Sequence, residues 1–476
     1  MIQPAFDARI PALGSEFADA VEAADFPAAT LRFRNDRAAA ELGLAGLTDP
    51  QWLDRFGGFE PLDAGFGPPL ALRYHGHQFR TYNPDIGDGR GFLFAQLRDD
   101  RGRLIDLGTK GSGRTPWSRD GDGRLTLKGA VREVLASEML EALGVPTGRT
   151  LSVVETGEQL ARHDEPSPTR GAVMVRSLWS HIRFGTFQRH AWFDRRDLLA
   201  TLIEHVVETY YPDLAETAGE ARAAALLSAI TGRSARLAGR WMAAGFVHGV
   251  LNTDNLNVTG ESFDYGPWRF LPWYEPGFTA AYFDEGGLYA YGRQAEAVFW
   301  NLQQLAACLS LVVEDPAPLI EALNGFSEAY HAALREAFTA RFGVASRGED
   351  ADSALTIAAL TFLRAAGEPM RWEPLFFDWF GGEASTARAM AGLRSALYAG
   401  PAFDAFRAAL TGYAPLRPEA LADPYFGRAE PEEMLFPEVE AIWAPIAERD
   451  DWSAFHAKLA SIRAAAEAYE LTPFGD

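Results

Sequence analysis

Two contrasting sequence patterns divide this 476-residue chain and limit the folds that it can adopt. Between residues 70 and 176 glycine is frequent, and short apolar runs predict strands at 91–97, 104–109, 150–154 and 171–176. One amphipathic segment, 127–143, predicts a helix between these strands, because Gly144 and Pro146 follow it as stop signals. The first half therefore predicts a sheet with one prominent helix.

The second half has helical apolar spacing instead. It predicts helices at 198–211, 220–244, 294–313, 319–342, 353–366 and 385–399. Residues 246–292 interrupt the helices with Gly, Asn, Asp and aromatic residues, and such loops commonly carry function. We predict an α+β fold, with an N-terminal extension (1–60), a β-rich N-lobe (61–177), a larger α-helical C-lobe (178–417) and a C-terminal helical segment (418–476).

Charge and composition exclude several classes of protein. Lys and Arg number 44 against 65 Asp and Glu, a net charge of -21, which disfavours nucleic acid and anionic membranes as partners. No apolar run is long enough to span a membrane, and no signal peptide is visible, so we expect a cytoplasmic protein. Cys308 is the single cysteine, which excludes a scaffold built on disulfides within the chain.

A local excess of positive charge lies within the predicted sheet. Residues 73–133 hold 12 Lys and Arg against 8 Asp and Glu, or +4, so the remainder carries -25. This suits a small anionic ligand in a cleft, although an ordinary surface patch explains the charge equally well. The chain has three lysines, and Lys110 and Lys128 lie in this basic segment.

The loop region contains residues suited to metal binding and proton transfer. Asn255 and Asp264 carry oxygen ligands of the kind that Mg²⁺ prefers, and we expect them on two strands of a hairpin that turns at residues 259–260. Asp254 would then accept a proton from a hydroxyl nucleophile. The alternative is a turn in which the Asp and Asn side chains cap their own backbone.

The β-rich half supplies candidates for phosphate binding. The turn at Gly87, Gly89 and Arg90 can bring backbone N–H groups close to an anion, or it is a plain hairpin turn. Lys110 ends a predicted strand, and a helical glutamate, Glu133 or Glu138, can pair with it as in protein kinases.

Two arginines follow the last predicted strand. Arg176 and Arg183 flank the segment 177–182 and together suit polyphosphate oxygens, although isolated arginines are more often surface charges.

The order of these motifs resembles the selenoprotein O family, which are protein adenylyltransferases on a protein-kinase-like, bilobal fold. The resemblance rests on residues 87–90, 110–116, 120–123, 175–187 (VRSLWSHIRFGTF), 248–255 (HGVLNTDN) and 264–267 (DYGP). It extends from about residue 30 to about residue 310.

The resemblance implies a function for each motif. ATP would bind flipped relative to kinases, so that AMP passes to a Ser, Thr or Tyr hydroxyl of a protein substrate. Asp254 would be the proton acceptor, and Asn255 with Asp264 would hold Mg²⁺ or Mn²⁺. The nucleotide would be bound by Gly87, Gly89, Arg90, Lys110, Asp122, Gly123, Glu133, Arg176, Arg183 and Asp264. We expect the two arginines to hold the terminal phosphate away from Asp254.

Some features depart from the family, and two other functions stay open. Many members carry a Cys or selenocysteine close to the C-terminus, where this sequence has none, and residues 418–476 look divergent. The same motifs also suit a conventional kinase that transfers the γ-phosphate. A nucleotide-binding pseudokinase scaffold is the non-enzymatic alternative.

Overall fold

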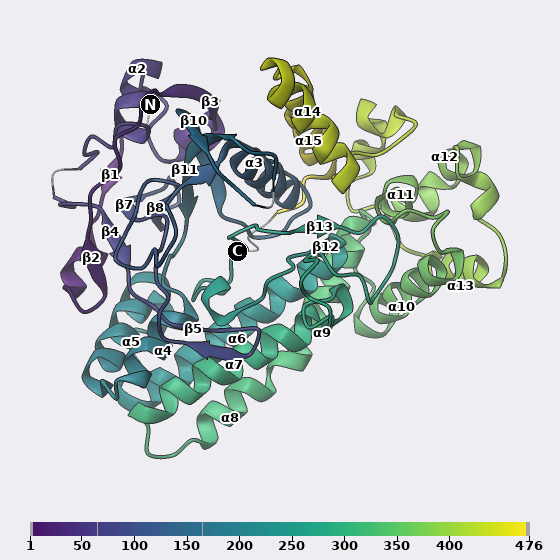
Figure 1. Ribbon diagram of the computed structural model, residues 1–476. Coiled ribbons are helices and arrows are strands. Elements are labelled where there is room, and N and C mark those ends of the chain that lie inside the picture. The colour runs from purple at the N-terminus through teal and green to yellow at the C-terminus, as the bar shows by residue number, and fades with distance from the viewer. Residues whose placement is uncertain (1–2, 64, 164, 473–476) are drawn as a thin grey trace.

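The computed structural model describes residues 3–63, 65–163 and 165–472. Figure 1 shows a sheet built by the purple and blue part of the chain, with the teal and green helices beside it. The α+β fold, with a β-rich N-lobe and a larger α-helical C-lobe, is confirmed and agrees with a bilobal kinase-like architecture. The four domain boundaries stay predictions.

The main sheet has nine strands within the described ranges, all paired in antiparallel fashion. Its order is β2-β4-β7-β8-β11-β10-β3, with β1 beside β7 and β9 beside β11. The strands are β1 (Ala5–Phe6), β2 (Ala18–Ala20), β3 (Thr30–Arg34), β4 (Leu70–Leu72), β7 (Leu93–Arg98), β8 (Leu104–Lys110), β9 (Leu125–Thr126), β10 (Arg149–Leu160) and β11 (Thr169–Leu178). Residues 1–60 thus supply β1, β2 and β3 to the sheet.

Helices cover both faces of this sheet. Successive side chains of its central strands point to opposite faces and pack into two different cores. Ala172 and Met174 of β11 share a core with helix α3 (Leu127–Ala142), whereas Val173 and Val175 pack with the N-terminal helices. Those helices are α1 (Asp36–Glu41) and α2 (Asp49–Phe56). Helix α3 begins where the Thr126 side chain accepts a hydrogen bond from the backbone of Gly129, as an N-cap residue does.

Helices form most of the C-lobe, as predicted, and there are more of them than the sequence pattern indicated. They are α4 (Phe184–Trp192), α5 (Arg196–Tyr210), α6 (Gly219–Ala243), α7 (Gln294–Leu309), α8 (Ala317–Asn324), α9 (Phe326–Arg341), α10 (Glu349–Ala366), α11 (Trp372–Asp378), α12 (Thr386–Ala391) and α13 (Pro401–Leu410). The single helices predicted at 319–342 and 385–399 are wrong. Gly325 separates α8 from α9, and α12 ends before Gly392, whose backbone is extended.

The C-terminal segment packs against the N-lobe. Helices α14 (Phe436–Arg449) and α15 (Ser453–Tyr469), yellow in Figure 1, lie beside α3. Phe455 of α15 is fully buried and meets Phe33 of β3 edge to face at 6.2 Å. In the described part of the chain, no helix has both the length and the apolar composition needed to cross a membrane.

Candidate active site

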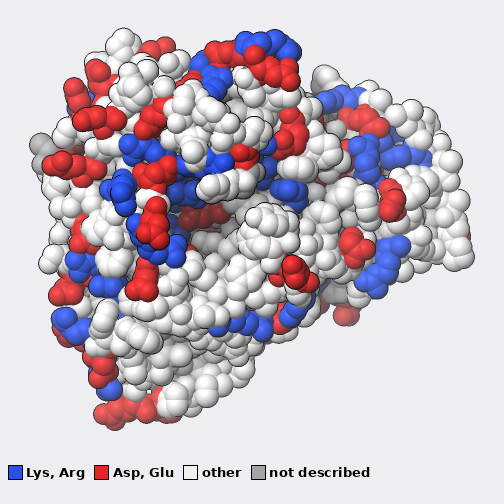
Figure 2. All heavy atoms as spheres, in the orientation of Figure 1, with Lys and Arg blue, Asp and Glu red and all other residues white. Residues whose placement is uncertain are grey.

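A cavity of about 820 Å³ lies between the glycine-rich turns of the sheet and the loop region before α7. Figure 2 shows it as a hollow bordered by Lys and Arg side chains, with acidic side chains inside. Every predicted site residue except Glu133 lines it, namely Gly87, Gly89, Arg90, Lys110, Asp122, Gly123, Arg176, Arg183, Asp254, Asn255 and Asp264. The structure therefore brings together motifs that lie far apart in the sequence.

Two cations project into the cavity from neighbouring strands. Lys110 of β8 pairs with Met174 of β11, and Arg176 of β11 pairs with Gly108 of β8. This register makes the Lys110 and Arg176 side chains diagonal neighbours on one face of the sheet. The Lys110 ammonium forms a buried ion pair with the Glu133 carboxylate. Burial lowers the pKa of Lys110, and Glu133 opposes that effect.

Glu138, the other candidate partner of Lys110, faces a different part of the molecule. Its carboxylate accepts a hydrogen bond from the Asn35 amide at 3.0 Å and lies 3.6 Å from Arg37. Burial raises the pKa of Glu138, and the Arg37 charge opposes this. Of the two glutamates, Glu133 is the one that contacts Lys110.

Asp264 is the centre of a cation cluster. Its two carboxylate oxygens accept hydrogen bonds from Arg176 at 2.5 Å and Arg183 at 2.7 Å, and the Lys110 ammonium lies 3.7 Å away. Burial opposes ionisation of Asp264, yet these three cations hold its pKa well below the usual range. Its backbone is left-handed (φ 58°), which Asp adopts more readily than most residues and which often marks a functional site.

Arg183 contacts the loop region that carries Asp254. It precedes α4 and bridges to Asn257, which brings its guanidinium against the loop region. There it donates to the backbone carbonyl of Asp254 at 2.6 Å and lies over the Tyr74 and Phe263 rings. Arg183 therefore lies beside Asp254, whereas Arg176 contacts Asp264, and the expectation that the two arginines hold the terminal phosphate away from Asp254 stays a prediction.

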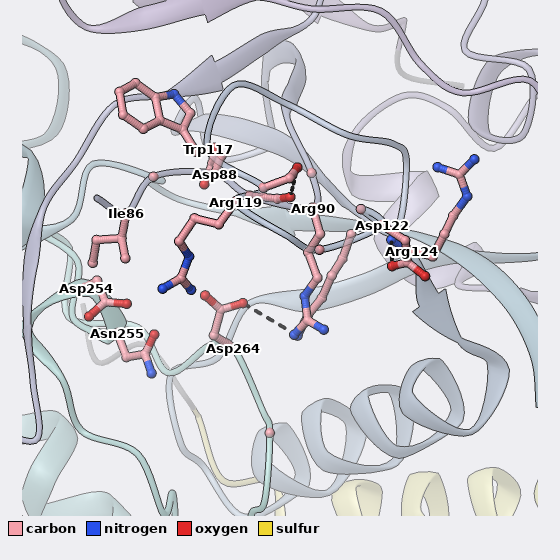
Figure 3. A pocket seen from close by; sticks show the side chains of 18 of the residues that line it. Ile86, Asp88, Arg90, Trp117, Arg119, Asp122, Arg124, Asp254, Asn255 and Asp264 are labelled. Carbon is pink, nitrogen blue, oxygen red and sulfur yellow. Dashed lines mark hydrogen bonds and ion pairs between the residues drawn. The ribbon is translucent and has the colours of Figure 1, made fainter. Parts of the chain in front are cut away.

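Asp254 and Asn255 lie in a 3₁₀ turn, Thr253–Asn255, at one end of the pocket (Figure 3). Burial raises the pKa of Asp254 to about 6, although the Arg183 charge acts against this. The Oδ1 atom of Asp254 is buried and has no hydrogen-bond partner among the residues described. The Asn255 amide N–H donates to the carbonyl of Val250 at 2.9 Å, which leaves its oxygen for a ligand.

The hairpin predicted between Asn255 and Asp264 does not form. A turn is present, and Gly260 has the left-handed φ of 72° that it requires. The flanking residues bond elsewhere, however, because Asn257 bridges to Arg183 and Ser262 to Thr147. The segment between Asn255 and Asp264 is thus held by bridges to Arg183 and Thr147, and not by pairing with itself.

Close backbone packing explains the glycines of the pocket wall. A side chain at Gly87 would meet the Trp117 ring at 2.6 Å, and one at Gly89 would meet the Trp117 carbonyl at 2.9 Å. Gly123 has a positive φ of 71° and touches the backbone of Gly113. Asp122 lies at the opposite end of the pocket from Asp254 (Figure 3), where it pairs with Arg162 at 2.7 Å.

Asp88, Tyr74 and Gln78 are among the pocket residues that were not predicted from the sequence. Asp88 lies between the two predicted glycines, and its buried carboxylate is 3.7 Å from Arg183. Burial raises the pKa of Asp88, and Arg183 opposes the shift. Tyr74 and Gln78 also line the pocket. The position of Asp88 inside the glycine turn could have indicated its place in the pocket. No sequence motif indicated Tyr74 or Gln78.

The residues present fit a divalent cation only together with a ligand that supplies further oxygens. Within the described residues, no three His, Cys, Asp or Glu side chains cluster as a metal site. Asn255 offers one amide oxygen, and Asp264 offers a carboxylate that its arginines now occupy. Mg²⁺ usually takes one or two protein ligands and completes its shell with phosphate oxygens and water, so this donor set fits that ion.

Comparisons of the sequence with known proteins show which family the chain belongs to. The family described as protein adenylyltransferase SelO matches residues 1–463, further than the motifs alone indicate. Proteins named protein nucleotidyltransferase YdiU are similar along most of the chain. The one from Synechococcus elongatus is 46% identical over 96% of this chain and 94% of its own. Those from Synechocystis sp. and Pseudomonas putida are 44% and 36% identical, over 95% and 85% of this chain and 96% and 81% of their own.

The family match and the matches to individual relatives both extend well beyond the short motifs. The family match covers nearly all of the sequence, including the loop region with Asp254 and Asp264. It also covers most of the C-terminal segment that looked divergent. This chain therefore belongs to the SelO family of protein adenylyltransferases.

Proposed function

We propose that this protein transfers AMP from ATP to the hydroxyl group of a Ser, Thr or Tyr side chain in another protein, with release of pyrophosphate. One observation carries the proposal: a single pocket holds the carboxylate of Asp254 beside three buried cations, Lys110, Arg176 and Arg183. The positions of the arginines do not distinguish transfer of AMP from transfer of the γ-phosphate. The choice of AMP therefore rests on family membership.

The chemistry needs a proton acceptor and positive charge in one place. The hydroxyl oxygen attacks the α-phosphorus, and the bond from that phosphorus to the pyrophosphate oxygen breaks. The Asp254 carboxylate takes the hydroxyl proton, and a pKa of about 6 leaves it ionised at neutral pH. Negative charge then gathers on the departing pyrophosphate, where the lysine and the two arginines stabilise it.

The remaining pocket residues would bind and orient the nucleotide. Glu133 holds Lys110 in place, and the close-packed turns at Gly87 and Gly89 present backbone to the phosphates. Asn255 and Asp264 would hold Mg²⁺, or Mn²⁺ in its place, and the ion would supply further positive charge to the phosphates when bound.

Labelled ATP tests this proposal directly. ATP labelled on the α-phosphate should label a protein acceptor, whereas ATP labelled on the γ-phosphate should not, and released pyrophosphate should match the label incorporated. The Asp254→Asn variant should lose the labelling, and Asp404→Asn, an exposed carboxylate on α13, should keep it. Transfer of the γ-label with ADP as product would establish a conventional kinase instead. Transfer of neither label would favour the scaffold.

A further inference from the structure

A small hairpin covers the turn that carries Asp254. Its strands are β5 (Gly76–Gln78) and β6 (Thr81–Asn83). The backbone N–H of His77 donates to the Thr253 hydroxyl at 2.7 Å, and that of Phe79 donates to the Asn252 side chain at 3.0 Å. Because residues 77 and 79 both bond to residues 252–253, the hairpin is fixed on the turn.

The alternate residues of β5 face the carboxylate. A side chain at position 76 would lie 2.8 Å from Oδ1 of Asp254, so only glycine leaves room for that oxygen. Gln78, two residues on, lines the same pocket as Asp254. The nearby Gln78 amide acts to lower the pKa of Asp254, against the larger opposite effect of burial.

A neighbouring side chain fixes the orientation of the Gln78 amide. The Asn83 amide N–H donates to the carbonyl oxygen of Gln78 at 2.9 Å, across the hairpin. A glutamine has one acceptor oxygen and one donor nitrogen, and the oxygen is the end that Asn83 engages. The donor end of Gln78 is therefore the one free to serve the carboxylate.

The tip of the hairpin is held in an unusual backbone conformation. Phe79 and Arg80 both have positive φ, 51° and 62°, where glycine or asparagine is usual. Phe79 packs on the Tyr289 ring at 5.0 Å, and Arg80 forms an ion pair with Glu296 at 3.0 Å. Residues so constrained persist only where their surroundings hold them, and they concentrate at functional sites.

We propose that Gln78 is a positioning residue for the proton acceptor: its amide, oriented by Asn83, holds the carboxylate of Asp254 where it can take the proton of the incoming hydroxyl. This inference rests on the proposed function. In the step concerned, the hydroxyl O–H bond breaks as its oxygen bonds to the α-phosphorus, the proton passes to Asp254, and pyrophosphate leaves with the electron pair of the broken P–O bond.

The test is AMP transfer by Gln78→Met, which keeps the length of the side chain and removes the donor. A loss of alignment of about 1 Å costs on the order of 10²-fold in rate, so we expect kcat to fall by roughly 10- to 100-fold. The KM for ATP, and ATP affinity measured by calorimetry, should stay unchanged. Gln159→Met, at an exposed position on β10, is the matched control and should behave like the wild type.

Two further variants distinguish positioning from a general effect on the fold. Gln78→Glu has the same shape and can still accept from Asn83, but it puts a negative charge beside Asp254, so kcat should fall as in Gln78→Met. In the Asp254→Asn background, Gln78→Met should cause no further loss, because both changes remove the same contribution.

Several results would overturn the inference that Gln78 positions Asp254. Wild-type kcat in Gln78→Met or Gln78→Glu overturns the inference, and so does an additive loss in the double variant. A fall in ATP affinity equal to the fall in kcat would make Gln78 a nucleotide ligand and also overturn it. Failure of the wild type to transfer the α-label would instead refute the proposed function itself.

Discussion

Replacing Asp264 by asparagine tests whether one carboxylate keeps three cations together inside the protein. Lys110, Arg176 and Arg183 contribute three positive charges, and the carboxylates that pair with them are those of Asp264, Glu133 and, at 3.7 Å, Asp88. Asparagine keeps the shape and tolerates the left-handed backbone of position 264, so the substitution removes little besides the charge. The variant would hold three buried cations against two carboxylates, those of Glu133 and Asp88.

The expected magnitude follows from the burial of these groups. The Asp264 side chain is 18% exposed, Arg176 8% and Arg183 4%. Removing one partner of a buried ion pair costs about 3–5 kcal/mol, because the other charge is left without compensation. We therefore expect the free energy of unfolding of Asp264→Asn to fall by about 3–5 kcal/mol. Inorganic pyrophosphate, an anion that can replace the carboxylate, should restore part of the loss.

Urea denaturation followed by circular dichroism measures this change, since the free energy of unfolding falls linearly with urea. Asp122→Asn is the matched control, because Asp122 lines the same pocket but its side chain is 49% exposed in its pair with Arg162. Exposed pairs contribute up to about 1 kcal/mol, so the control should change little. A loss in Asp264→Asn no larger than in the control would refute the account of the cation cluster.

Three other substitutions test separate parts of the structure. Asp254→Asn should lower turnover by ~10²–10⁴-fold and leave ATP affinity by calorimetry unchanged, and an equal loss of both would make Asp254 a ligand or a structural residue. Burial raises the pKa of Glu261 to about 7, so its stabilising contribution, complete below its unfolded pKa, should disappear as pH rises through 7. Urea titrations from pH 5 to 8 should show a larger loss in the wild type than in Glu261→Gln, in which Asp254 and Glu433 still titrate. Burial also raises the pKa of Cys308 to about 12, so Cys308→Ser should have wild-type activity in oxidant and in reductant. Activity that depends on redox state in the wild type alone would contradict this.

The sequence predicted those elements whose signals are local. Helix α3 begins within a residue of its prediction, because Thr126 caps it and Gly144 follows it. The break at Gly325 was missed because the apolar spacing continues across it from α8 into α9. Strands β1, β2 and β3 were also missed, since such short strands are defined by their partners in the sheet, not by a pattern of their own.

The motifs predicted which residues meet in the site, but not all of their contacts. The contact between Arg183 and the backbone of Asp254 was not predicted, because residue spacing says nothing of the bridge from Arg183 to Asn257. Gln78 and Tyr74 carried no signal, since their relevance depends on a hairpin and a loop that pack only in the folded chain.

Helix α3 explains why the sequence left Glu133 and Glu138 as rivals. The two residues are five apart, so at about 100° per residue they point in directions roughly 140° apart. On a helix with one exposed face, one of the two glutamates would be solvated, and the other would be the evident partner of Lys110. Here the sheet covers one side of α3 and the C-terminal helix α15 another, so both glutamates are buried and each needs a cation.

Glu133 and Glu138 contact different partners. Glu133 meets Lys110 on the pocket side, and Glu138 meets Asn35, Arg37 and, at 3.7 Å, Arg463 of α15. Since burial of an unpaired carboxylate is costly, exchanging the two roles would require turning α3 against both of its neighbours. The packing of a helix near the C-terminus therefore contributes to fixing which glutamate faces Lys110, and no pattern within α3 itself carries that information.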